Sequence, residues 1–183
     1  MGRMLGFAQN SGRCVMNEKR QMLRHFLAAL AYRTQKALRD SPERFYEFSA
    51  GLQTRTPHQL ICHMTNVLGY VRSYFIGGTF PSRQATNWEL DLNAFHGMLE
   101  DLGKYLDSET PLRDTTEERM LQGPFSDAMT HVGQLAMLRR LAGFPIPPED
   151  FIMADVRSGN LGPNQPEPVS PERIWLEGPA QKL

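Results

Sequence analysis

The sequence is poor in the residues that mark disulfide-rich and zinc-thiolate proteins. Only two of its 183 residues are cysteines, Cys14 and Cys62, and they form no CxxC motif. This argues against a disulfide framework and against a zinc-thiolate cluster, and it fits a reducing compartment, so we predict a cytoplasmic protein. Because free cysteine is among the most buried residue types, Cys62 is interpreted as a buried structural thiol.

Net charge and long apolar runs are also missing. Twenty Lys and Arg residues balance twenty Asp and Glu residues, which gives a formal net charge of zero. Without an excess of positive charge, binding to nucleic acid or to an anionic membrane is not expected. The longest apolar runs, such as residues 26–32, are far shorter than the roughly 20 residues that span a bilayer. We therefore expect a soluble protein without nucleic-acid or membrane partners.

Strand-like alternation is weak throughout, and apolar residues recur instead at helical spacing. Long helices are predicted over residues 17–39, 57–76, 88–106 and 123–143, with a short helix near 115–120. The second helix is the best delimited, with Thr56 as N-cap, Pro57 at the first helical position and Gly77 at the end. Because the loops are of moderate length, consecutive helices are expected to be antiparallel neighbours.

A chain of this length fits one domain. The predicted fold is all-α, a four-helix bundle over residues 17–154. Residues 1–16 are expected to form an N-terminal arm, and residues 155–183, rich in proline and glycine, an extended tail that packs over the bundle or stays mobile. Inward side chains on facing helices of such a bundle can build a metal site.

A candidate metal site begins with Asp127 and His131 on the last long helix. Residues four apart share one helix face, so both side chains could hold one ion, and Gln134 lies near the same stripe. Two ligands rarely hold a divalent ion tightly, so a third is needed from elsewhere. His63 falls on the edge of the apolar face of the second helix beside Leu60, and it is the candidate third ligand.

Plainer interpretations of the same residues stay open. His63 could be a hydrogen-bonded core histidine, and Asp127 could be a favourable charge near a helix start. Gly133 in mid-helix costs about 1 kcal/mol relative to alanine. This cost predicts a compensating close approach beside His131, by a neighbouring helix or a substrate, or an ordinary packing contact.

A rival pair lies on the third predicted helix. His96 and Glu100 have the same spacing of four residues, but their neighbours look solvated, so we interpret them as a surface hydrogen-bonded couple. His58, in the first turn of the second helix, and His25, on the first helix, are both expected to be exposed.

Two motifs carry a resemblance to a known family. Residues 130–135 read Thr-His-Val-Gly-Gln-Leu and are preceded by Asp127, while residues 57–63 of an earlier helix read Pro-His-Gln-Leu-Ile-Cys-His. Together they resemble the DinB/YfiT-like superfamily of four-helix-bundle metalloenzymes, and the resemblance covers residues 17–143. The fold that it implies agrees with the fold predicted from the helical periodicity.

The resemblance also implies a ligand set. Many members of the family bind metal through a histidine on the second helix and an HxxxH motif on the last long helix, followed by a Gly-Gln pair. These positions correspond to His63, Asp127 and His131, with Asp127 where the usual residue is histidine. Two histidines and one carboxylate suit Zn or Ni first, with Mn or Fe as alternatives. Gln134 is expected to orient a ligand or to face the substrate.

Three functions are compatible with these observations. Characterised relatives include transferases and isomerases that use mycothiol, bacillithiol or glutathione, with the metal stabilising the thiolate. The resemblance thus implies a metal-dependent S-transferase or hydrolase whose substrate is a small molecule, with a low-molecular-weight thiol as the partner of the transferase. The first alternative is a non-catalytic bundle, such as a homodimer or a stress-related binding protein, in which the three residues form a hydrogen-bond network. The second is a small-ligand binder without turnover.

Overall fold

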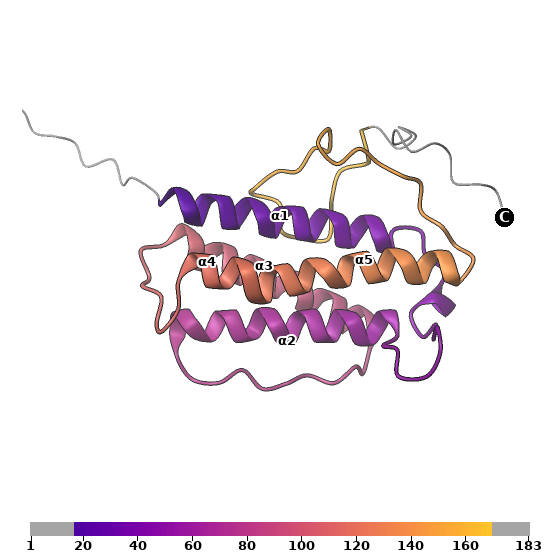
Figure 1. Ribbon diagram of the computed structural model, residues 1–183, viewed down its shortest axis with the longest axis horizontal. Helices are drawn as coiled ribbons and strands as arrows, with labels where there is room; N and C mark the ends of the chain where they lie inside the picture. The colour runs from indigo at the N-terminus through magenta and orange to yellow at the C-terminus, as the bar shows by residue number, and fades with distance from the viewer. Residues whose placement is uncertain (1–16, 170–183) are drawn as a thin grey trace, which may run out of the picture.

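The computed structural model describes residues 17–169, and every regular element among them is a helix. The elements are α1 (Glu18–Leu38), η1 (Glu43–Phe45), α2 (Pro57–Ile76), α3 (Trp88–Asp107), α4 (Glu117–Met120), η2 (Leu121–Phe125) and α5 (Ser126–Leu141). The four long helices lie side by side as a bundle (Figure 1). The predicted all-α bundle is therefore confirmed for this part of the chain.

Two of the predicted regions lie partly or wholly outside the described residues. The expected arm, residues 1–16, is outside them, as are residues 170–183 of the expected tail. Within residues 17–169, the structure contains no helix that combines the length and the apolar character needed to cross a bilayer.

Local sequence signals place the helix starts. The Asn17 side chain accepts a hydrogen bond from the backbone N–H of Lys19 at the start of α1. At the start of α2, Thr56 and Gln59 form a reciprocal capping box, with Pro57 in the first helical position. Each cap satisfies backbone N–H groups that have no partner within the helix. Both predicted N-caps, Asn17 and Thr56, are confirmed.

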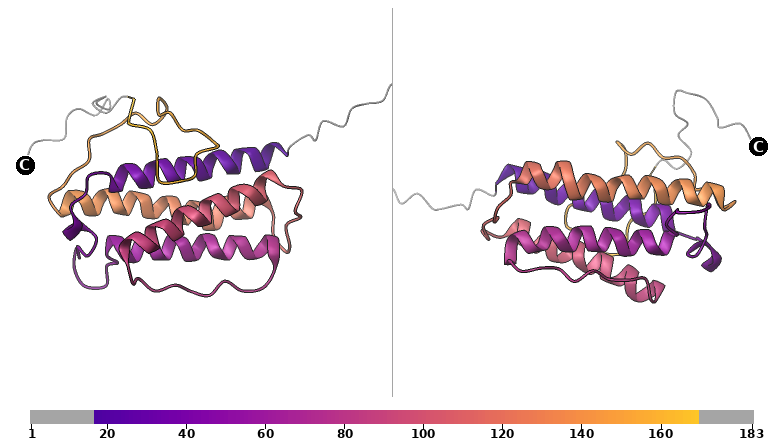
Figure 2. Two further views of the ribbon diagram at one scale, coloured as in Figure 1. Left: turned by 180° about the vertical axis from the view of Figure 1, so that it is seen from behind. Right: turned by 60° about the horizontal axis from the view of Figure 1, so that its bottom comes forward.

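The helix directions differ from the expected antiparallel series. In the views of Figures 1 and 2, α2 and α3 run in the same direction. The segment that links them returns along the outside of α2. Residues 77–87 make this return, and Asn66 in the middle of α2 donates to Ser82 Oγ and to the Arg83 carbonyl. Fully extended, such a segment reaches about 35 Å, enough to pass the length of α2, about 30 Å.

Parallel α2 and α3 change which helices are neighbours. Both α1 and α2 pack against α3 and α5, so α1 and α2 lie on opposite corners of the bundle. The expectation that consecutive helices are antiparallel neighbours is therefore wrong twice: α2 and α3 are neighbours but parallel, and α1 and α2 lie at opposite corners. Residues 77–87 are long enough to run back along α2, which lets α3 begin beside the start of α2. All four long helices contribute to one apolar core, with Leu27, Leu68, Leu99 and Leu135 fully buried.

The last long helix also departs from its predicted start. Instead of beginning near Gly123, the helix runs on from α4 through a wide π turn, η2, into α5. Pro124 sits inside this turn and has no N–H to donate, while Ser126 Oγ donates to the Leu121 carbonyl at 2.6 Å. A π turn is frequent at functional sites because it shifts the side chains that follow it. Asp127 lies two residues beyond this one.

Residues 155–169 pack over α1 and α3 rather than standing away from the bundle. Leu161 is buried in the core, where its Cδ1 lies so close to Gly103 that a Cβ there would approach it to 2.4 Å. Arg24 donates to the Ser158 carbonyl at 2.6 Å, and Gln35 donates to the Pro163 carbonyl at 2.7 Å. Of the two behaviours expected for the tail, this part shows the packed one.

This packing overturns the interpretation of His96 and Glu100. His96 is buried, and its Nδ1 lies 3.0 Å from the Leu161 carbonyl. The two residues were predicted to form an exposed couple, which is wrong for His96 because residues 155–169 cover its face. His25 is exposed as predicted, with Nδ1 3.1 Å from Ser158 Oγ.

Candidate metal centre

Helices α2 and α5 bring His63, Asp127 and His131 together. His131 Nε2 lies 3.5 Å from Asp127 Oδ1, and His63 Nε2 lies 3.7 Å from Asp127 Oδ2. The two imidazole rings face each other edge to plane, with centroids 4.7 Å apart. Each residue offers one ligand atom, and the three atoms lie within 4.8 Å of one another. The three residues singled out in the sequence therefore form one group that could hold a metal ion.

Gln134 decides which nitrogen of His131 faces this group. Its side-chain Oε1 lies 2.8 Å from His131 Nδ1. A carbonyl oxygen only accepts, so the hydrogen of the neutral imidazole is on Nδ1 and the lone pair is on Nε2. Fixing a histidine through its second nitrogen is how ligand histidines are usually oriented. Gln134 contacts His131 and also lines a cavity, so both roles expected for it, orienting a ligand and facing the substrate, stay predictions.

The lone pair of His131 Nε2 then points at a group that cannot donate. The nitrogen is buried, no residue among 17–169 makes a hydrogen bond to it, and the nearest charged atom is the Asp127 carboxylate oxygen at 3.5 Å. Two acceptors facing each other are stabilised by a cation between them. Tetrahedral coordination with bonds of about 2.1 Å separates ligand atoms by about 3.4 Å, close to the 3.5 and 3.7 Å measured here. The distances from the two histidine nitrogens to the Asp127 carboxylate are therefore those of a group that could hold a divalent ion.

The group is closed on one side and open on the other. Exposure of the side chain rises from 8% for His131 to 30% for His63 and 48% for Asp127. Burial, followed by the positive charge of Arg55 and the neighbouring His131, lowers the pKa of His63, against the opposing effect of Asp127. A lowered pKa favours the neutral imidazole, which is the form that binds metal. The open side leaves room for a water molecule or a substrate.

Gly133 does not have the contact expected of it. A Cβ placed on Gly133 would have no atom of the described residues within 4 Å, apart from its own helix. The predicted close approach of a neighbouring helix and the predicted packing contact are therefore wrong, while the approach of a substrate stays a prediction. Gly133 is exposed on the outer face of α5, so neither a neighbouring helix nor a cavity wall reaches it.

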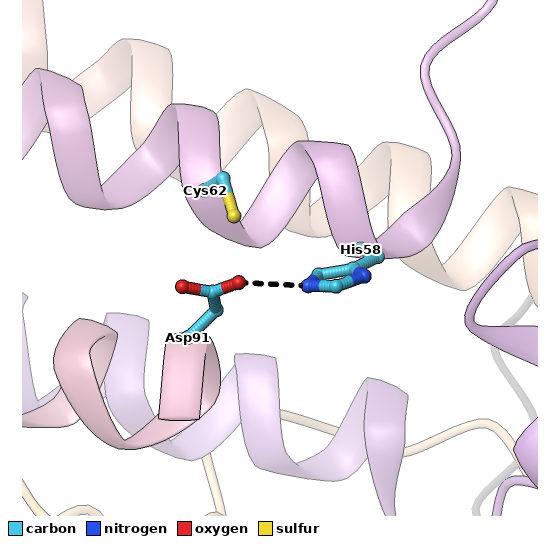
Figure 3. A group of neighbouring side chains, drawn as sticks. All are labelled: His58, Cys62 and Asp91. Carbon is cyan, nitrogen blue, oxygen red and sulfur yellow. Dashed lines mark hydrogen bonds and ion pairs between the residues drawn. The ribbon is translucent and has the colours of Figure 1, made fainter. Parts of the chain in front are cut away.

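A second group, His58, Cys62 and Asp91, lies nearby where the starts of α2 and α3 meet (Figure 3). His58 Nε2 is 2.9 Å from Asp91 Oδ2, and His58 Nδ1 is 2.9 Å from Glu47 Oε1. The prediction that His58 is exposed is wrong, since only 5% of its surface is accessible. The parallel course of α2 and α3 buries it, because it brings Asp91 against the first turn of α2.

Asp91 is saturated with hydrogen bonds. Its Oδ2 accepts from the backbone N–H groups of Thr86 and Asn87 and contacts His58, while Oδ1 accepts from Arg83 at 3.1 Å. Burial opposes ionisation of Asp91, but these hydrogen bonds outweigh it and hold its pKa well below the usual range. The carboxylate is thus a buried anchor for the start of α3.

Cys62 completes this second group and is buried, as predicted. Burial, together with the charge and hydrogen bonding of Asp91, raises the pKa of its thiol to about 11. A protonated thiol is a poor ligand, and the lone pairs of Asp91 already have donors, so this group is less suited to an ion than the first. The spacing of four residues between His58 and Cys62 could have indicated it from the sequence, but their acidic partner comes from another helix.

Two cavities flank the first group. One, of about 630 Å³, is lined by residues that include Leu60, Gln134 and Leu138. The other, of about 390 Å³, is lined by residues that include His63 and Arg83. Of the three candidate ligands, His63 lines the smaller cavity directly, while the larger cavity adjoins the group through Gln134, which contacts His131.

Comparison with known proteins adds no family assignment. No family model matches the chain, and no similar protein was found among curated proteins or among solved structures. The resemblance to DinB-like proteins therefore stays a prediction.

Proposed function

We propose that His63, Asp127 and His131 hold a divalent metal ion and that the protein is a metal-dependent enzyme acting on a small molecule. The observation that carries this proposal is the buried lone pair of His131 Nε2, which faces the Asp127 carboxylate at 3.5 Å with no hydrogen-bond partner among the described residues. A divalent ion between the two acceptors removes their repulsion. Zn or Ni suits the mixed nitrogen and oxygen donors best, ahead of Mn or Fe.

The chain's own residues prepare this chemistry. Gln134 holds His131 in the tautomer that offers Nε2, and Asp127 supplies one negative charge on the solvent side. A divalent ion, when bound, acts as a Lewis acid that lowers the pKa of a coordinated water or thiol. The reaction we propose is S-transfer from a low-molecular-weight thiol, as the DinB-like resemblance implies, or hydrolysis by water.

The competing interpretation, a non-catalytic hydrogen-bond network, is less well supported. Hydrogen bonds between nitrogen and oxygen are typically 2.7–3.2 Å long, and the two contacts of Asp127 measure 3.5 and 3.7 Å. The second group shows what a network looks like in this protein, with contacts of 2.9 Å on both nitrogens of His58. Turnover separates an enzyme from a simple binder.

Metal content tests the site. Protein purified without a polyhistidine tag and incubated with Zn, Ni or Mn should retain about one ion per chain. His63→Ala and His131→Ala should lose it, while His25→Ala, which removes an exposed histidine away from the site, should not. Absence of bound ion after all three incubations, or loss of the ion in His25→Ala as well, would sink the proposed site.

Reaction class is tested on the metal-loaded protein. Glutathione with an aromatic chloride as electrophile reports S-transfer, and a nitrophenyl ester without thiol reports hydrolysis. Activity in either assay that disappears in His131→Ala and persists in His25→Ala supports an enzyme. A loaded protein that turns over neither substrate, and no other in a wider panel of thiols and esters, is better described as a binder.

A further inference from the structure

Arg55 occupies a position shared by the two cavities beside the proposed metal centre. It lines the cavity of about 630 Å³ and also the cavity of about 390 Å³. It immediately precedes Thr56, the N-cap of α2, and its charge acts on His63. Arg55 is therefore placed to contact a molecule bound in either cavity.

The guanidinium of Arg55 is uncommitted. Arg83, the other arginine of the smaller cavity, is bound to Asp91 at 3.1 Å. In contrast, no hydrogen bond or ion pair engages Arg55 within residues 17–169, and its side chain is exposed. An arginine presents five N–H donors in a planar fork that matches a carboxylate.

The charge around the two cavities is one-sided. Neither cavity has an Asp or a Glu among the described residues that line it. A divalent ion held by two neutral imidazoles and one carboxylate keeps a net positive charge, which adds to that of Arg55. An anionic ligand is favoured at this point and a cationic one is disfavoured.

The larger cavity is mainly apolar. Leu60 and Leu138 form its buried wall, and Met137 and Leu141 stand at its rim with 63% and 60% of their surfaces exposed. Binding a ligand that covers exposed apolar side chains is favourable, because it removes their apolar surface from water. The ligand should therefore carry an apolar body next to its anionic group.

We propose that Arg55 binds the carboxylate of a small substrate whose apolar body occupies the larger cavity. This inference deepens the proposed function and rests on it for the reacting end of the substrate. It names the substrate class as amphipathic carboxylates, and it makes Arg55 a specificity-determining residue.

The test compares two ligands of one skeleton, 4-phenylbutanoate and its neutral amide. Dissociation constants are measured by ligand-observed NMR on the full chain, both metal-free and loaded with Zn. The wild type should bind the acid about tenfold more tightly than the amide. Arg55→Gln should lose this preference, Arg55→Lys should keep part of it, and Arg140→Gln, which removes an exposed arginine outside both cavities, should keep all of it.

Acetate and inorganic phosphate separate the two parts of the inference. Acetate lacks the apolar body and should bind far more weakly than 4-phenylbutanoate, and so should phosphate. The proposal is overturned if the acid and the amide bind equally, if neither binds, if phosphate binds as tightly as the acid, or if Arg55→Gln keeps the preference. Metal content is measured on the same samples, so a protein that binds no ion yet prefers the acid contradicts the metal site and supports the role of Arg55.

Discussion

Two groups of side chains in this bundle contain histidine and aspartate, and they differ in what surrounds them. In the group of His58 and Asp91, the carboxylate accepts hydrogen bonds from two backbone N–H groups and an arginine, and it also contacts the imidazole. In the group of His63, Asp127 and His131, the carboxylate is half exposed, and a buried imidazole nitrogen has no hydrogen-bond partner in the described structure. Histidine and aspartate thus anchor the fold in the first group, whereas in the second group their nitrogen and oxygen atoms stay free to bind a metal ion.

This difference indicates that the hydrogen-bond partners of a histidine and an aspartate, more than the residue types themselves, determine whether they can bind a ligand. A carboxylate whose lone pairs are taken by fixed N–H groups stabilises the fold and has little left for a ligand. A set of acceptors without donors carries a cost that a bound cation removes.

Asp91→Asn should be the most destabilising substitution in either group. The amide would face the N–H groups of Thr86 and Asn87 with fewer acceptor sites and would leave Arg83 without its charged partner. Removing one member of a buried pair costs about 3–5 kcal/mol, which urea unfolding followed by circular dichroism would measure as a lower free energy of unfolding. Asp127→Asn is the matched control, and in metal-free protein it should cost less than about 1 kcal/mol because Asp127 is half exposed. Similar losses in free energy of unfolding at Asp91 and Asp127 would contradict the distinction between a structural group and a ligand-binding group.

Metal should stabilise the protein through one group only. A ligand that binds only the folded state at a concentration 100-fold above its dissociation constant adds about 2.7 kcal/mol to stability. Zn or Ni should therefore raise the melting temperature of the wild type, measured by thermal unfolding, and of His58→Ala relative to its own metal-free value. The rise should vanish in His131→Ala. A rise that depends on His58 and is independent of His131 would exchange the roles assigned to the two groups.

Much of this fold was accessible from the sequence because its signals are local. Asn17, Thr56 and Pro57 mark helix starts through their own chemistry, and the periodicity of α2 and α5 placed His63, Asp127 and His131 on inward or nearly inward faces. Residues four apart on one helix share a face regardless of how the rest of the chain folds.

What escaped prediction depends on contacts between distant segments. His58 is buried because residues 77–87 run back along the outside of α2, so that Asp91 lies against it, and His96 is buried because Leu161 of the C-terminal segment packs over it. Neither contact leaves a periodic trace in the sequence. The π turn before Asp127 was missed for a related reason, since Gly123 and Pro124 usually mark a helix start rather than the inside of one.

Acid should weaken the anchor at Asp91. A carboxyl group whose pKa is lowered by folding stabilises the protein fully above its unfolded pKa, near 3.9, and this contribution is lost as the pH falls toward the folded value. The difference in free energy of unfolding between the wild type and Asp91→Asn should therefore be constant from pH 7 to pH 5. It should shrink by about 1.3 kcal/mol at pH 3. Urea titrations at the three pH values test this, and a difference that grows on acidification would contradict it.

Gly133→Ala should produce the smallest effect and should stabilise the protein. The new methyl group would have no atom of the described residues within 4 Å outside its own helix, so nothing opposes the gain in helix propensity. That gain is about 0.5–1 kcal/mol at an exposed helix position, and it appears as a higher urea midpoint with an unchanged slope. Metal content should stay the same, because the methyl group would contact no neighbouring helix or loop of the described residues. A loss of stability, or a loss of metal without loss of stability, would show that this stretch of α5 is more constrained than its open surroundings indicate, and it would place Gly133 within the candidate site.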